Sequence, residues 1–241
     1  MTANNEKWVM KWFERRMWDC TPTSVRGQAI VLYLPFSTDI EVLKRCANVL
    51  SDEERQRAEL FKTDDGKRRF IQRRAFRRYC AFLADDTNQD LSQVQFSETD
   101  KGRPFLTDRN NLSFSFSSCS SGCLGAWSSS HAIGVDIEDQ RQNIEAIELA
   151  QEFFSNAEAV KLEKLETVER VRTFLRYWSL KEAALKSIGE GLPFGMDAFE
   201  FQLDPDVRIV RAPTDPSRFS AHLVSVPKTT AALVVSEFSV F

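Results

Sequence analysis

Two acidic residues on one short segment are the first candidates for chemistry. Asp136 and Glu138 lie in the run Ala-Ile-Gly-Val-Asp-Ile-Glu at 132–138, so on a strand both carboxylates project from one face. Neighbouring carboxylates repel each other unless a cation lies between them, and magnesium binds small sets of such hard oxygen ligands. The segment indicates either a magnesium site or a strand end that runs into an acidic, solvated loop, because Asp139 follows.

A second candidate group lies further along the chain. Trp178, Glu182 and Lys186 are spaced by four residues, so they share one face of a helix. Taken alone, Glu182 and Lys186 would form a surface ion pair worth about 0.2–0.5 kcal/mol.

A dense group of basic residues is the third feature. It comprises Lys67, Arg68, Arg69, Arg73, Arg74, Arg77 and Arg78. Such density suits nucleic acid, a phosphorylated small molecule or an acidic protein. The alternative is a solvated helix face with no ligand.

In the first half of the chain, expected elements surround the basic cluster. A strand is expected at Ala29–Leu34, and Ser51 with Glu54 has the form of a capping box that opens a helix through Phe61. A helix over Lys67–Leu83 and strands at Val94–Ser97 and Leu112–Ser117 follow, the last with alternating Phe and Ser typical of a half-buried strand. The runs Cys123–Ser128 and His131–Glu138 predict a hairpin across Ser129-Ser130.

The second half predicts three helices and then short strands. The helices cover Ile144–Phe153, a segment from a second capping box at Ser155 and Glu158 to about Leu165, and Thr167–Ser187. The strands are expected at Phe199–Leu203, Val207–Val210, Ala221–Val226 and Ala231–Val240. Both halves thus run from strand through helices to strands, which is consistent with a duplicated α+β architecture and a cleft between the halves.

The composition narrows the class of protein. Of 241 residues, 42% are hydrophobic and 28% charged, as in ordinary globular domains, and no apolar run approaches the roughly 20 residues of a membrane helix. Five scattered cysteines argue against a disulfide framework, and Lys7–Arg16 lacks a secretory pattern. We therefore expect a cytoplasmic protein. The pI of about 5.6 disfavours nucleic acid as the partner of the basic cluster.

Two motifs, in order, identify a family resemblance. The segment from Trp178 to Lys186 resembles the W-x-x-K-E-A-x-x-K signature of the 4′-phosphopantetheinyl transferase superfamily, and Gly134–Glu138 is similar to its G-[IV]-D-[IV]-E motif. Three further segments resemble the family less strongly. Lys101–Pro104 resembles its G-[KR]-P turn, and Phe153–Glu158 resembles its F-F-[ST]-x-x-E motif. The segment that begins at Ser51 and ends at Arg73 resembles its basic N-terminal helices. The length resembles the larger, pseudo-dimeric surfactin-synthetase-activating branch.

The resemblance implies a fold and a reaction. The fold is α+β, with two similar α/β lobes related by a pseudo-two-fold axis and the active site in the cleft between them. Residues 1–125 would form the lobe with the coenzyme A-binding helices, and 126–241 the lobe with the magnesium and catalytic motifs. The reaction moves 4′-phosphopantetheine from coenzyme A to a serine of an apo-acyl or peptidyl carrier protein and releases adenosine 3′,5′-bisphosphate.

The resemblance also implies roles for the motif residues. Asp136, Glu138 and Glu182 would hold Mg²⁺, Glu182 would also accept the serine proton, and Lys186 would bind the pyrophosphate. Lys181 would either orient Glu182 or face solvent. The residues expected to bind coenzyme A are Arg57, Arg68, Arg69, Arg73, Arg103, Ser117, Ser118 and Lys186. Arg74, Arg77 and Arg78 would be solvated or would attract an acidic carrier, and the carrier would dock near Phe153–Glu163 and after Lys186.

One position departs from the family pattern. The family has a phosphate-binding histidine where this chain has Ser118, and serine brings no positive charge. Losing such a charged hydrogen bond costs about 1.5–3 kcal/mol unless another group replaces it. Besides an active monomeric transferase, the sequence leaves open a degenerate relative that binds coenzyme A or carrier proteins without turnover, and a nucleic-acid-binding module.

Overall fold

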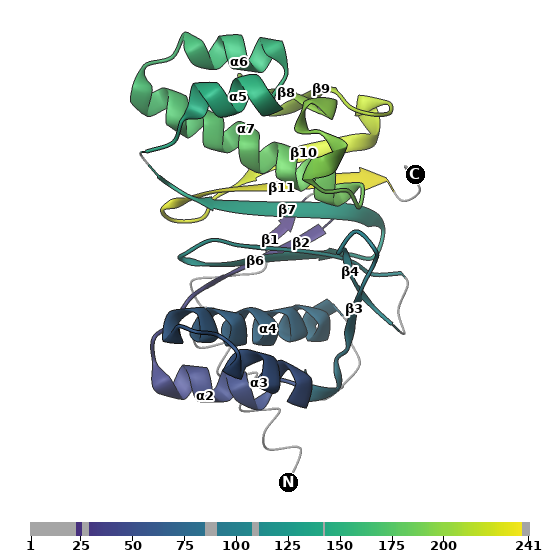
Figure 1. The fold of residues 1–241 in the computed structure, drawn as a ribbon. Helices are drawn as coiled ribbons and strands as arrows, with labels where there is room; N and C mark the ends of the chain where they lie inside the picture. Colours follow the sequence, from purple (N-terminus) through teal and green to yellow (C-terminus); the bar gives the residue numbers. More distant parts are fainter. Residues whose placement is uncertain (1–22, 26–28, 85–90, 108–110, 142, 238–241) are drawn as a thin grey trace.

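The computed structural model describes residues 23–25, 29–84, 91–107, 111–141 and 143–237, and this part of the chain stacks as two sheets between two groups of helices (Figure 1). The helices on one side are α2 (Ile40–Asn48), α3 (Asp52–Glu59) and α4 (Asp64–Ala84). Those on the other side are α5 (Ala146–Phe153), α6 (Asn156–Glu163) and α7 (Thr167–Ser187).

Both sheets are antiparallel. The first has the order β1-β2-β6-β5, and its strands are Thr23–Val25, Ala29–Pro35, Gly122–Ser128 and Ser113–Ser118 in that order. The second has the order β10-β11-β7, with strands Phe219–Val224, Thr229–Glu237 and His131–Asp139. Two further antiparallel pairs are β3–β4 (Phe96–Glu98, Pro104–Leu106) and β8–β9 (Glu200–Gln202, Arg208–Arg211). The α+β class is confirmed.

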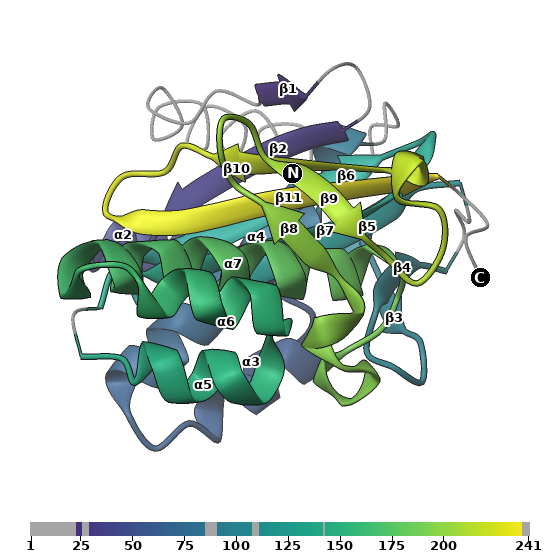
Figure 2. The same ribbon diagram turned by 90° about the horizontal axis from the view of Figure 1, so that it is seen from above.

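Three hydrophobic cores separate the layers, because the central strands are apolar on both faces. In β2, Leu32 and Leu34 face α4, while Ala29 and Val31 face the second sheet. Strand β11 divides in the same way between the other sheet and α7. Figure 2 shows α7 running along the second sheet, with α5 and α6 packed on the far side of α7 and the β8–β9 pair beside them.

Local sequence signals placed the main elements correctly. Both capping boxes form: Ser51 Oγ accepts from the Glu54 amide and Ser155 Oγ accepts from the Glu158 amide, and each glutamate accepts from its own cap residue in return. The predicted helix Thr167–Ser187 is confirmed at both ends. These signals succeed because a capped helix end satisfies its own exposed amides without help from the rest of the chain.

The predicted hairpin across Ser129-Ser130 is wrong. Strand β6 pairs with β2 and β5, whereas β7 pairs with β11 in the other sheet. The Ser128 hydroxyl accepts hydrogen bonds from the amides of Ser130 and His131 and turns the chain sharply at this point. The turn therefore carries the chain from one sheet to the next, a distinction that alternating hydrophobicity cannot make.

The helix α2, the strands β1 and β4 and the short 3-10 helices at Leu91–Gln93, Leu192–Phe194, Met196–Ala198 and Pro216–Arg218 are described elements that were not expected. The start of α2 has a signal in Asp39, whose side chain accepts from the amides of Glu41 and Val42. The predicted end of the last strand beyond Glu237, the segment Lys7–Arg16 and Cys20 lie outside the described residues. None of the helices in the described ranges is long and apolar enough to cross a bilayer.

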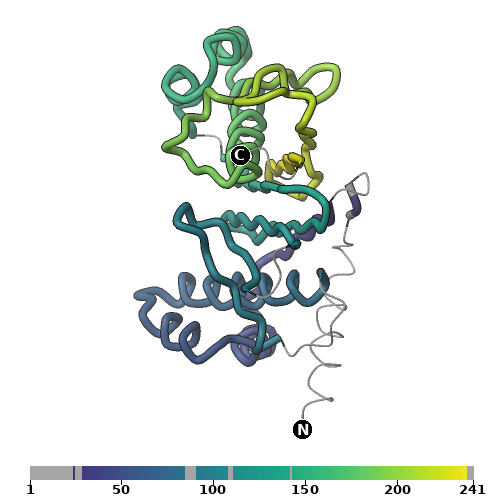
Figure 3. Tube along the Cα trace, turned by 90° about the vertical axis from the view of Figure 1, so that its right-hand side faces the viewer, coloured from purple at the N-terminus to yellow at the C-terminus, as the bar shows by residue number. Residues whose placement is uncertain are grey.

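The two halves of the chain occupy different layers. Figure 3 shows the first half, through β6, on one side and the chain from β7 onward on the other. Each half contains a 21-residue helix packed on an antiparallel sheet, α4 and α7. The proposed division at 125/126 falls inside β6. The division and the pseudo-two-fold relation stay predictions.

Candidate active site

The strand β7 and the helix α7 bring the three acidic candidates together. On β7, Ile133, Val135 and Ile137 enter the core between the sheets, so Gly134, Asp136 and Glu138 face α7, as the alternation predicted. A Cβ built on Gly134 would collide with the carbonyl oxygen of Ala183 and the amide nitrogen of Ser187. Glycine at 134 therefore lets α7 lie close to β7.

Lys186 joins the two elements electrostatically. Its Nζ donates to Asp136 Oδ1 at 2.8 Å and lies 3.6 Å from Glu182 Oε2. Asp136 is only 4% exposed, and its Oδ2 is buried without a hydrogen-bond partner among the described residues. The ammonium thus balances part of the negative charge, and one carboxylate oxygen is left without a hydrogen bond.

The pKa values reflect this crowding of charge. Burial, followed by repulsion from Asp136, raises the pKa of Glu138 to about 6. Burial also raises the pKa of Glu182, an effect that Lys186 opposes and Asp136 reinforces. For Lys186 burial alone would lower the pKa, but the charges of Asp136 and Glu182 raise it overall. Arg141, which pairs with Glu138 at 3.4 Å, opposes the rise in the pKa of that residue, but the three carboxylates still outnumber Lys186 and Arg141.

Asp136, Glu138 and Glu182 are the residues whose oxygens could hold a metal ion. Among the described residues, however, no group of three or more acidic, histidine or cysteine side chains is close enough together to coordinate a metal ion as it stands. The Lys186 ammonium lies at the position between Asp136 and Glu182 where a cation is expected.

A row of serines fixes β5 against β7. Ser113 Oγ and Ser115 Oγ accept from the amides of Ile133 and Val135, and Ser117 Oγ donates to Asp136 Oδ1 at 2.9 Å. The serine face of β5 is therefore buried at its first two positions against β7, and the expectation of a half-buried strand is corrected. The reason is that a hydroxyl is small enough to allow close approach and polar enough to satisfy the edge amides of β7.

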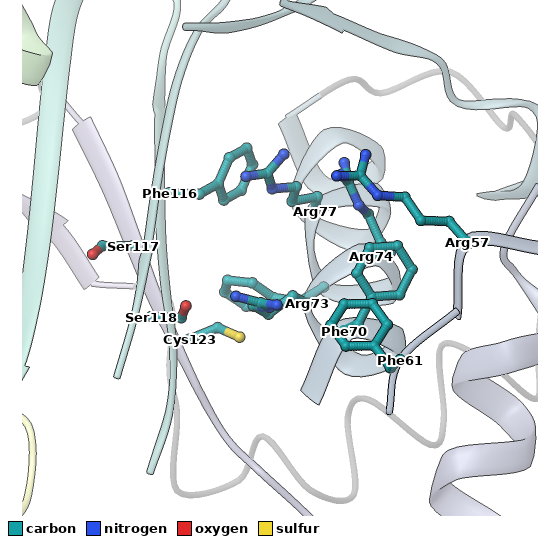
Figure 4. Close-up of a pocket in the computed structure, with 11 residues that line it drawn as sticks. Arg57, Phe61, Phe70, Arg73, Arg74, Arg77, Phe116, Ser117, Ser118 and Cys123 are labelled. Atoms are coloured by element: carbon teal, nitrogen blue, oxygen red, sulfur yellow. The ribbon is translucent and has the colours of Figure 1, made fainter. Parts of the chain in front are cut away.

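A pocket rich in arginine lies beside this row, between α3, α4 and β5 (Figure 4). We define the arginine pocket by its lining residues, Arg57, Phe61, Phe70, Arg73, Arg74, Phe76, Arg77, Phe116, Ser117, Ser118 and Cys123. Arg74 lies 5.3 Å from the Phe70 ring centre and Arg77 lies 5.2 Å from that of Phe116. Guanidinium groups held in this way suit phosphate. Ser117 connects the pocket to Asp136.

Not all candidate arginines reach this pocket. Arg57 and Arg73 line it, whereas Arg68 and Arg69 pair with Asp65 on their own helix at 3.2 Å and 2.8 Å. Arg103 donates to Ser113 Oγ at 2.6 Å, and its side chain lies near Gly189, just after α7.

The C-terminal part of the basic cluster also differs from expectation. Arg74 and Arg77, expected to be solvated or to attract an acidic carrier, line the pocket instead. Arg78 is 5% exposed, pairs with Glu54 at 2.9 Å and donates to three backbone carbonyls, so the idea that it is solvated is wrong. Helical phase relative to the buried Phe76 could have ranked these residues.

Lys181 neither orients Glu182 directly nor faces solvent. It is fully buried, and its Nζ lies 2.8 Å from Glu158 Oε2 and donates to the carbonyl of Met196 at 3.0 Å and to that of Phe199. Glu158 Oε1 accepts from the Phe201 amide. The pair therefore ties α6, α7 and the start of β8 together behind the site.

Comparisons with known proteins agree on a family. Residues 132–235 match the model of the 4′-phosphopantetheinyl transferase superfamily. The chain is similar to the 4′-phosphopantetheinyl transferase HetI of Nostoc, with 30% identity over 85% of this chain and 86% of HetI. It is also similar to the 4′-phosphopantetheinyl transferase Sfp of Bacillus subtilis, with 31% identity over 50% of this chain and 52% of Sfp. Among solved structures, the crystal structure of holo-[acyl-carrier-protein] synthase from Neisseria meningitidis matches 44% of this chain and 97% of its own chain. The TM-score is 0.35 and the sequence identity 18%, so the likeness is too weak for comparing sites.

Proposed function

Because the chain belongs to the 4′-phosphopantetheinyl transferase superfamily, we propose that it transfers the 4′-phosphopantetheine moiety of coenzyme A to a serine hydroxyl of an apo-acyl or peptidyl carrier protein. The observation that supports this most directly is the meeting of two distant motifs. Lys186 Nζ lies 2.8 Å from Asp136 Oδ1 and 3.6 Å from Glu182 Oε2, and Ser117 links Asp136 to the arginine pocket.

The donor set fits magnesium. Asp136, Glu138 and Glu182 are three neighbouring carboxylates. Burial, with repulsion from Asp136 as a further cause, raises the pKa of Glu138 and of Glu182, and Asp136 Oδ2 has no hydrogen-bond partner in the described part of the chain. Hard oxygens in a crowded, negatively charged site favour this ion. We propose that these three residues hold Mg²⁺, which when bound would offset the negative charge of the pyrophosphate.

Glu182 is the proposed proton acceptor. The carrier serine oxygen forms a bond to the phosphorus that carries pantetheine, and the bond from that phosphorus to the bridging pyrophosphate oxygen breaks. The serine proton passes to Glu182, and adenosine 3′,5′-bisphosphate leaves. A raised pKa makes Glu182 a better base near neutral pH than an exposed carboxylate.

Lys186 is proposed to hold the leaving group. Its ammonium is close to the site carboxylates and has a raised pKa, so it stays charged at neutral pH. A fixed positive charge beside the pyrophosphate stabilises the charge that develops on the leaving oxygen. The arginine pocket, reached through Ser117, would bind other phosphate groups of coenzyme A.

We further propose a monomer that acts in the cytoplasm on carrier proteins, and not on nucleic acid or membranes. Arg57, Arg73, Arg74 and Arg77 converge on a pocket with aromatic walls, which suits a small phosphorylated ligand better than a duplex. A relative without turnover is not favoured, because the acidic residues and Lys186 are all present. Light scattering of the purified protein tests the monomer.

The deciding experiment is intact-mass spectrometry of apo-carrier proteins incubated with coenzyme A, magnesium and the enzyme. We expect one phosphopantetheine group to be added to a carrier, and the addition to stop with a chelator or with Glu182→Gln. The matched control is Glu169→Gln, a half-buried residue of the same helix that pairs with Arg172. No addition to any fatty-acid, polyketide or peptide carrier at millimolar coenzyme A would contradict the proposal.

A further inference from the structure

The turn between β3 and β4 is tight and closed on itself. The amide of Gly102 donates to the carbonyl of Thr99 at 2.8 Å, and the amide of Thr99 donates to the carbonyl of Arg103 at 2.9 Å. Gly102 has a φ of 80°, a left-handed conformation that glycine adopts without steric cost. The side chains of Lys101 and Arg103 therefore extend from a fixed backbone.

These two side chains reach the end of α7, in the other half of the chain. Lys101 Nζ donates to Glu190 Oε1, and a Cβ built on Gly189 would lie 3.6 Å from Arg103 Nη1. In Figures 1 and 2 the β3–β4 pair lies on the side of the sheets where α7 ends. A turn of the first half thus touches the end of the helix that carries Lys186.

Helix α7 ends in a Schellman motif at these points of contact. The amide of Glu190 donates to the carbonyl of Leu185 at 2.9 Å, and the amide of Gly189 donates to the carbonyl of Lys186 at 3.1 Å. Gly189 has a φ of 75°, the left-handed conformation that this motif uses. The carbonyl of Lys186 is an acceptor within the motif, so a contact that holds the motif also holds the backbone of Lys186.

Arg103 also joins this helix end to β7. Its Nη2 donates to Ser113 Oγ at 2.6 Å, and the same oxygen accepts from the amide of Ile133 at 3.3 Å. Among the described residues no carboxylate pairs with Arg103, and burial lowers the pKa of its guanidinium. Its charge lies instead at the C-terminal end of α7, where the helix dipole favours a cation. The link falls beside Gly134, where α7 packs on β7.

We propose that the β3–β4 turn clasps the end of α7, and that Arg103 and Lys101 are positioning residues that keep Lys186 within reach of Asp136. This inference rests on the proposed function, in which Lys186 holds the leaving group. Lys186 Nζ lies 2.8 Å from Asp136 Oδ1, and a displacement of about 1 Å is enough to lower a rate about 100-fold. In this role Arg103 acts through the helix and does not touch coenzyme A.

The first test is the kinetics of carrier modification by the full-length protein with coenzyme A and magnesium. Arg103→Met should lower kcat about 10- to 100-fold and leave the KM for coenzyme A within about threefold. Arg103→Lys keeps the charge, so it should recover part of the loss. In a Lys186→Ala background, followed in single turnovers so that slow transfer is still resolved, Arg103→Met should cause no further loss.

The second test is hydrogen exchange of the amides of Gly189 and Glu190, which needs no turnover. Exchange should be at least about tenfold faster in Arg103→Met, because the last turn of α7 opens more often. Lys101→Glu should give a smaller rise, about two- to fivefold, because its ion pair is exposed. Adding Glu190→Lys to that variant reverses both charges and should restore the slow exchange.

Arg170→Met is the matched control. Arg170 lies near the opposite end of α7, where it donates to the carbonyls of Leu162 and Leu165. Its loss should speed exchange at the start of α7 and leave kcat and the amides of Gly189 and Glu190 unchanged.

A raised KM for coenzyme A with unchanged kcat in Arg103→Met would show that Arg103 binds the ligand and would overturn the inference. Unchanged exchange at the end of α7, faster exchange without a loss of kcat, or a further loss in the Lys186→Ala background would overturn it too. If the wild type modifies carriers and Arg103→Met behaves like it, the inference fails and the proposed function stands. If exchange reveals the clasp but the wild type modifies no carrier, the clasp stands and the transferase proposal fails.

Discussion

At the scale of single residues, four charged side chains set the balance of charge in the candidate active site. Asp136, Glu138 and Glu182 compete for positive charge, and Lys186 supplies only one. The buried Asp136 accepts from both Ser117 and Lys186 at one oxygen. Burial favours the protonated forms of Glu138 and Glu182 and so raises the pKa of both.

The raised pKa of Glu138 predicts a pH dependence in metal-free protein. The ordinary value is 4.5 and the folded value about 6, so in this window the folded state holds a proton that the unfolded state has lost. The contribution of Glu138 to stability is therefore complete below pH 4.5 and is lost as pH rises through about 6, by about 1–2 kcal/mol. Magnesium affinity should rise over the same range.

Urea unfolding between pH 4 and 7, with a chelator present, checks this expectation. The free energy of unfolding should fall with pH more steeply in the wild type than in Glu138→Gln, which cannot titrate. Parallel pH profiles for the two proteins would show that Glu138 has an ordinary pKa in the folded state.

Ser118 allows a second test at residue scale. Because the family pattern has a histidine there, Ser118→His should add a cation to the arginine pocket when the ring is protonated. At pH 6 we expect the Ser118→His variant to bind coenzyme A about 3- to 10-fold more tightly than the wild type does. At pH 8 the gain in affinity should be smaller. Ser118→Asn, a neutral donor, is the control in the same calorimetric titration, and a gain independent of pH would contradict the role of charge.

At the scale of elements, the contact between β7 and α7 positions the catalytic groups. Gly134→Ala places a methyl group against backbone atoms of Ala183 and Ser187, so α7 must move away from β7. Glu182 and Lys186 move with it, and we expect a loss of activity of at least about 100-fold together with about 1–3 kcal/mol of stability.

Steady-state kinetics and thermal unfolding measure the two effects of Gly134→Ala. The matched control is Ile133→Val on the opposite face of β7, which should cost about 0.5–1.5 kcal/mol and leave activity nearly unchanged. Wild-type activity in Gly134→Ala would mean that the contact is not needed to position α7.

The buried Lys181–Glu158 ion pair is a second contact between elements, since it holds α6 against α7. Removing one partner leaves the other charge buried, so Lys181→Met should cost about 3–5 kcal/mol. The double variant Lys181→Met, Glu158→Leu should cost less than either single change, because no charge is left unpaired. Chemical denaturation of the three variants forms a double-mutant cycle. Simple additivity would show that the pair does not act as a unit.

The whole molecule is held together by the core between the sheets, which neither half can complete alone. Leu233 is fully buried there, whereas Leu223 on the neighbouring strand is 37% exposed. Leu233→Ala should cost about 2–5 kcal/mol, and Leu223→Ala less than about 1 kcal/mol. Because the inter-sheet core joins the halves, we expect one cooperative calorimetric transition in the wild type and in both variants. Two separate transitions would show that the halves unfold independently.

The sequence by itself determined the local elements and the chemical groups. Serine caps, with glutamate three residues on, defined α3 and α6 because the signal is completed within one turn. Strict alternation placed Asp136 and Glu138 on one face of β7 because the strand period is two. The spacing of Glu182 and Lys186 placed both on one side of α7.

Only the tertiary structure decided which segments meet. The turn at Ser129-Ser130 looks like a hairpin in sequence, yet it joins two different sheets, because pairing partners are chosen by cores that distant segments build. The same dependence separated Arg73, Arg74 and Arg77 in the pocket from Arg68 and Arg69 beside Asp65. Charge density is a local property of the chain, whereas the ligand that a charge can reach depends on what packs around it.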